Sequence, residues 1–68
     1  MDESSRIKLL SLQRMEATEA EVYRRLARMQ SNPVNRSILE GIALEEERHE
    51  AVIERMTGEK VKADMGKV

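Results

Sequence analysis

The sequence predicts an all-α protein, an antiparallel two-helix hairpin that dimerises into a four-helix bundle. Residues 6–30 contain neither glycine nor proline, and residues 34–57 contain no proline and a single glycine, so each segment suits a long helix. Asn32 and Pro33 separate the two segments, as expected for a short turn between helices. Both segments carry apolar residues at helical spacing, in stripes wider than one neighbouring helix covers. A second hairpin packed face to face would cover both stripes.

The first helix is expected to run from about Arg6 to Gln30. Ser4 or Ser5 is the predicted N-cap, because a serine hydroxyl can accept a hydrogen bond from the first unpaired amides. On a helical wheel an apolar stripe surrounds Glu16, which is therefore expected to point toward the interior of the bundle. The central members of that stripe are Leu9, Leu12, Ala20, Tyr23 and Ala27.

The second helix is expected to run from Pro33 to about Thr57. Asn32 is a favourable N-cap, and a proline in the first helical position loses nothing by lacking an N–H group. Gly58 is expected to end the helix in the left-handed conformation. The apolar stripe of this second helix contains Leu39, Ile42 and Ile53, and Glu46 lies among them. Each helix thus aims a carboxylate at the expected core.

Length and composition limit the class of protein. A chain of 68 residues forms one small domain, here assigned to the hairpin in residues 1–58, with residues 59–68 as a flexible C-terminal tail. Without cysteine, neither disulfides nor thiolate metal sites are available. The remaining routes to stability are a metal, association with a second copy, or both.

Charge and hydropathy argue against two kinds of partner. The 12 basic and 13 acidic residues give a net charge of −1, which disfavours binding to nucleic acid through a basic surface. No apolar run approaches the roughly 20 residues of a membrane span. We therefore expect a soluble and cytoplasmic protein.

The motif with the clearest chemistry is the Glu-x-x-His pair of Glu46 and His49, which project from one helix face. In a hairpin that turns near residue 32, Glu16 lies 16 residues before the turn and Glu46 lies 14 after it, so the two occupy nearly one level. A glutamate facing Glu-x-x-His is half of a di-iron carboxylate site. A second chain would complete the set to four glutamates and two histidines. The alternative is a core histidine hydrogen-bonded to Glu46.

Four further residues are candidates for supporting roles. Glu19 is a possible extra metal ligand or a carboxylate on the path to the site, although a salt bridge within the dimer is an equal alternative. Tyr23 lies two turns after Glu16 and would hydrogen-bond a ligand or pass an electron, unless it is simply a core aromatic residue. Glu45 and Glu50 flank the motif and are expected around the ligands or in solvent.

Several stretches resemble the rubrerythrin-type ferritin-like domains. They are Met15–Glu19 with Val22–Ala27, Asn35–Ala43 with Glu46–His49, and the ending Thr57–Val61. The resemblance implies that Glu16, Glu46 and His49 are metal ligands. Full-length members carry four helices in one chain, so this sequence is similar to the half-ferritins, such as encapsulated ferritins, in which two hairpins share a di-iron site. A similar two-helix start also precedes the membrane part of some vacuolar-iron-transporter relatives.

The resemblance implies a ferroxidase, an enzyme that oxidises ferrous iron with dioxygen or peroxide in iron storage or detoxification. It implies an iron cofactor, with manganese or zinc as substitutes, and a homodimer or ring of dimers. An encapsulating shell or a membrane transporter domain would be a further partner. Two alternatives remain: a non-catalytic metal-sensing or delivery module of a larger protein, and a purely structural helical dimerisation module.

Overall fold

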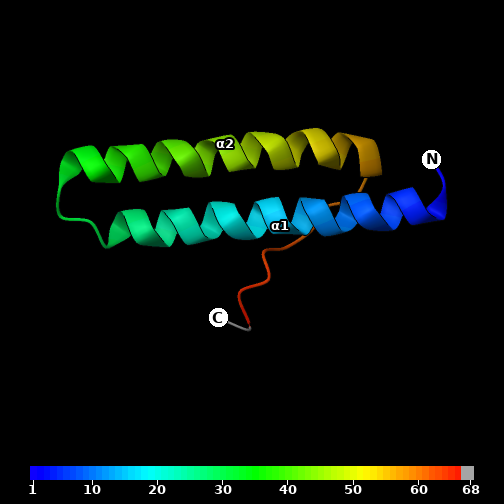
Figure 1. Ribbon diagram of the computed structural model, residues 1–68, viewed down its shortest axis with the longest axis horizontal. Helices are drawn as coiled ribbons and strands as arrows, with labels where there is room; N and C mark the ends of the chain where they lie inside the picture. Colours follow the sequence, from blue (N-terminus) through cyan, green and yellow to red (C-terminus); the bar gives the residue numbers. More distant parts are fainter. Residues whose placement is uncertain (67–68) are drawn as a thin grey trace.

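The computed structural model describes residues 1–66 and contains two α-helices that lie antiparallel, side by side (Figure 1). Helix α1 spans Glu3–Arg28 and helix α2 spans Pro33–Thr57. The described residues include no β-strand. The predicted all-α hairpin is thereby confirmed.

Helix α1 begins earlier than predicted, because its N-cap is Asp2. The Asp2 side chain accepts a hydrogen bond of 2.7 Å from the backbone N–H of Ser5. The prediction of Ser4 or Ser5 as the cap was wrong, since an aspartate two or three residues upstream caps equally well and places both serines inside the first turn. At the other end, the amides of Met29 and Gln30 donate to carbonyls only three residues back, which tightens the last turn.

Helix α2 has the predicted ends. Asn32 Oδ1 accepts hydrogen bonds from the amides of Val34 at 2.9 Å and Asn35 at 3.1 Å. Pro33 occupies the first turn, where its missing N–H needs no partner. Gly58 follows the helix with φ of 72°, and its N–H donates to the carbonyl of Glu54 at 2.7 Å. A residue with a Cβ would be strained in this left-handed conformation.

The seam between the helices is built mainly from small side chains. Ala20, Ala27 and Ala43 are buried together with Ile53. Alanines let two helix backbones approach closely, but they remove little apolar surface from water. Most of the large apolar side chains remain exposed: Ile7, Leu12, Met15, Leu26, Met29, Val34, Ile38, Leu44, Val52 and Met56. No helix among the described residues has the length and apolar character needed to cross a membrane.

Polar contacts connect the first half of α1 to the end of α2. We call the residues that make them the Gln13–Thr57 cluster: Arg6, Gln13, Thr57 and Glu59. The Gln13 side chain is fully buried, and its Oε1 accepts a 2.7 Å hydrogen bond from the Thr57 hydroxyl. Its Nε2 donates to the carbonyl of Glu59, also at 2.7 Å. Arg6 donates to the carbonyl of Thr57 at 2.7 Å and forms an ion pair with Glu59. The cluster thus ties α1 to the end of α2.

Beyond Gly58 the chain runs back beside α1 without forming a helix (Figure 1). Besides the Gln13 contact, the amide of Asp64 donates to the Thr18 hydroxyl at 2.8 Å. Alternate residues Val61, Ala63 and Met65 are half-buried, the period of an extended segment with one face against the protein. The flexibility of the tail stays a prediction, and its residues 67–68 lie outside the described part.

Candidate metal centre

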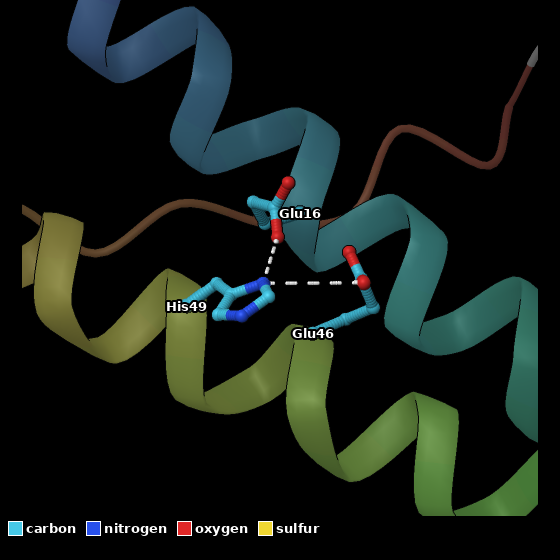
Figure 2. A group of neighbouring side chains, drawn as sticks. All are labelled: Glu16, Glu46 and His49. Atoms are coloured by element: carbon cyan, nitrogen blue, oxygen red, sulfur yellow. Dashed lines mark hydrogen bonds and ion pairs between the residues drawn. The ribbon is translucent and has the colours of Figure 1, made fainter.

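Three potential metal ligands meet between the helices at mid-length (Figure 2). Glu16 comes from α1, and Glu46 and His49 come from successive turns of α2. The His49 Nδ1 atom lies 3.0 Å from Glu16 Oε2 and 4.0 Å from Glu46 Oε1. One donor atom from each residue lies within 4.8 Å of the other two. The antiparallel register therefore brings together the three residues that the sequence singled out.

The three side chains differ in exposure. Those of Glu16 and Glu46 are 15% and 16% exposed, whereas that of His49 is 57% exposed. Glu46 Oε2 is buried and has no hydrogen-bond partner among the described residues. A carboxylate oxygen without water or a donor is costly, since burial removes its hydration without replacing it. A cation, or a proton on the neighbouring Glu19 carboxyl, would compensate it.

The donor set suits a transition-metal ion. Carboxylate oxygens and an imidazole nitrogen bind such ions at about 2.0–2.2 Å, so ligand atoms around one ion lie roughly 3–4 Å apart. The separations of 3.0 Å and 4.0 Å from His49 Nδ1 are in that range, and the three donor atoms all lie within 4.8 Å of one another. The unpartnered Glu46 oxygen also fits, because a cation would compensate its charge. Three donors leave a coordination shell of four to six positions incomplete.

Glu16 and His49 form a hydrogen bond whose donor depends on the histidine tautomer. The pair is a hydrogen bond of 3.0 Å, and a carboxylate can only accept, so Nδ1 is the donor when Glu16 is ionised. An ion bound to Nδ1 must displace that proton. Metal binding at this atom is therefore coupled to proton release.

Glu19 adds a third acidic group, on the same side of α1 as Glu16. The pKa of Glu19 is raised, because a protonated Glu19 can share a hydrogen bond with the Glu46 carboxylate; burial and repulsion between the two charges contribute less. Glu19 therefore borders the three-residue group, and its role as a ligand stays a prediction.

The three other candidates from the sequence are not members of the Glu16, Glu46 and His49 group. Tyr23 is half-buried on α1. Glu45 is exposed and pairs with Arg48, one turn along α2, at 2.5 Å. Glu50 lines a separate shallow groove with Ala17 and Ala20. Supporting roles for these three residues stay predictions.

Sequence reasoning missed the Gln13–Thr57 cluster, which lies one turn before Glu16 on α1. A signal was present, because Arg6, Gln13, Ala20 and Ala27 recur every seven residues. The two alanines of that series lie in the seam between the helices, so Gln13 occupies a core position. Its partners are 44 and 46 residues away in sequence, and no local pattern identifies them.

No family model, curated protein or solved structure matches this chain. The similarity to ferritin-like domains therefore stays a resemblance of motifs.

Proposed function

We propose that this protein is a ferritin-like ferroxidase in which two hairpins form a four-helix bundle and share a di-iron site. One observation carries the proposal: Glu16, Glu46 and His49 present donor atoms within 4.8 Å of one another, and a buried Glu46 oxygen lacks a partner. A glutamate from one helix and Glu-x-x-His from the next form half of a di-iron carboxylate site. The sequence motifs that resemble rubrerythrin-type domains support the same reading.

The surroundings of His49 support association of two hairpins across this face. On α2, Ile38, Val52 and Met56 lie on the His49 side by helical spacing and are 51–56% exposed. On α1, Leu12 lies one turn before Glu16 and is 39% exposed. A face that combines exposed apolar side chains with an incomplete ligand set would gain from a second copy in both respects. Burial would remove apolar surface from water, and the partner would supply the missing donors.

In the proposed reaction, ferrous iron is the substrate. Two ferrous ions give up one electron each, and dioxygen takes up these two electrons and two protons and leaves as hydrogen peroxide. Glu16 and Glu46 would hold the ions as terminal or bridging ligands, and anionic oxygen donors stabilise the more highly charged ferric product over the ferrous substrate. His49 would be a terminal nitrogen ligand after releasing its Nδ1 proton.

The first test is an anaerobic titration of metal-free protein with ferrous iron, followed by light scattering and then by admission of dioxygen. We expect about one iron per chain, formation of a dimer, and a ferric absorbance band with oxygen consumption. His49→Ala should lower the oxidation rate at least about tenfold, as expected when a ligand is removed. Arg48→Ala is the control, because Arg48 is an exposed neighbour of His49 on α2 and is not among the candidate site residues. Full activity in the His49 variant would disprove the assignment.

A second candidate function is a metal-delivery or sensing module without turnover. The exposure of the His49 ring favours it, because an open ligand can pass an ion to another protein. In that case the same titration gives metal binding but no oxidation above the rate of free iron. A dimer that forms equally with and without metal, and binds none, would instead indicate a structural dimerisation module.

A further inference from the structure

A second feature lies near the turn between the helices, away from the metal centre. It is an open groove of about 640 Å³ lined by Arg24, Ala27, Arg28, Arg36, Glu40 and Leu44. Arg24 and Arg28 come from the end of α1, and Arg36 comes from the first turns of α2. Three arginines from two helices therefore line one groove. Three carboxylates accompany them: Glu40 in the lining, and the ion-pair partners of Arg24 and Arg28.

Each of these arginines is held in place on one side. Arg24 forms an ion pair with Glu47 across the helix seam. Arg28 lies 3.7 Å from Glu21, and Arg36 donates to the carbonyl of Gln30 at 2.7 Å and 3.2 Å. These contacts occupy only part of the five N–H donors that each guanidinium carries. Arg24 and Arg36 are thus oriented in advance, which lowers the entropic cost of binding a ligand. The Arg28 side chain is 63% exposed and retains more freedom.

The groove and the proposed dimer face lie on different sides of the hairpin. On α2, Leu44 precedes His49 by five residues and Glu40 precedes it by nine. At about 100° per residue these positions point roughly 140° and 180° away from His49. A dimer formed through the His49 face would therefore leave the groove accessible, and the two sites are independent.

We propose that this groove binds a phosphate group. Guanidinium groups match the geometry of phosphate oxygens and bind them through paired hydrogen bonds. Among the described residues Arg36 has no carboxylate within 4.0 Å, so its charge is the one left for an anion, and Arg24 and Arg28 add further N–H donors. The volume is in the range of small-molecule sites, roughly 300–1,000 Å³, and exceeds what phosphate alone fills. The apolar lining from Ala27 and Leu44 would contact the organic part of a phosphomonoester. Free phosphate and a phosphomonoester share the group that the arginines recognise.

The test is a titration of the full chain, labelled with nitrogen-15, with inorganic phosphate and separately with phenyl phosphate. Sodium chloride keeps the ionic strength constant, and the amide signals of Ala27 and Leu44 report binding. We expect saturable shifts at these two residues. Tighter binding of phenyl phosphate would identify a phosphomonoester site, and equal affinities would identify a site for the phosphate group alone.

Three variants separate a built site from general attraction to positive charge. Arg28→Gln should weaken phosphate binding about fivefold or more, because charge-assisted hydrogen bonds are lost. Glu40→Gln should strengthen binding about twofold or more, because the carboxylate beside the arginines repels an anion. Arg14→Gln is the control, since Arg14 is an exposed arginine outside the groove. Equal weakening by the Arg14 and Arg28 variants, or shifts that chloride reproduces, would overturn the proposal.

Discussion

Two polar clusters lie one helical turn apart on α1, and they are satisfied to different degrees. In the Gln13–Thr57 cluster, both polar atoms of the fully buried Gln13 amide have hydrogen-bond partners at 2.7 Å. In the cluster of Glu16, Glu46 and His49, a buried oxygen of Glu46 has no partner among the described residues. The first cluster is completed by the chain itself. In the second, a cation or a proton on Glu19 would compensate the Glu46 carboxylate, so this cluster is the one that is open to a ligand.

The largest effect is expected from metal at the second cluster. At about 100 times its dissociation constant, a ligand that binds only the folded state adds about 2.7 kcal/mol to the free energy of unfolding. We expect zinc, which is redox-inert, to raise the melting temperature at fixed protein concentration, and a chelator to reverse the rise. Glu46→Gln should abolish this response, because the amide is a poor metal ligand.

The same variant provides a control on folding. Without metal, the Glu46→Gln protein should be no less stable than the parent, because the substitution removes a buried charge that has no partner. A large loss of stability in the metal-free variant would mean that Glu46 is structural. An unchanged response to zinc would mean that the ion binds elsewhere.

A smaller effect is expected from breaking the first cluster. Gln13→Leu keeps a similar volume but leaves the Thr57 hydroxyl without its Gln13 acceptor and the Glu59 carbonyl without its Gln13 donor. We expect a loss of about 2 kcal/mol in the free energy of unfolding, measured by urea denaturation of the metal-free chain. The double variant with Thr57→Val should recover part of this loss, because both partners are then apolar. Simple addition of the two single losses would contradict a coupled pair.

The smallest effect is expected at Asp2, a polar group that is satisfied but exposed. The hydrogen bond from the Ser5 amide lowers the pKa of Asp2, and a second bond with the Ser5 side chain adds to the effect. The ionised form therefore stabilises the folded state above the ordinary aspartate pKa. That contribution is lost as the pH falls through the lowered pKa of the folded state. Asp2→Ala should flatten the acid limb of helicity against pH, measured by circular dichroism, whereas Glu3→Ala should leave it unchanged.

Features that depend on local spacing could be predicted correctly from the sequence. Helix α2 has the predicted cap at Asn32 and the predicted left-handed ending at Gly58, because both are set by residues within a few positions. The relative level of Glu16 and Glu46 also follows from local rules, since two straight helices and a short turn leave one register. The contact between Glu16 and His49, 33 residues apart, is a consequence of that register.

Which side chains are buried and paired across the helices could not be predicted from local spacing, because it depends on how the two helices pack. The apolar stripe around Glu16 contained both Leu12 and Ala20, yet the alanine is buried and Leu12 is 39% exposed. Likewise, Gln13 finds its partners 44 and 46 residues away, and the tail contacts Thr18 across 46 residues. Periodicity identifies a face of a helix but not the depth to which a neighbour covers it. That depth depends on how closely two backbones approach, which is a property of the packed pair.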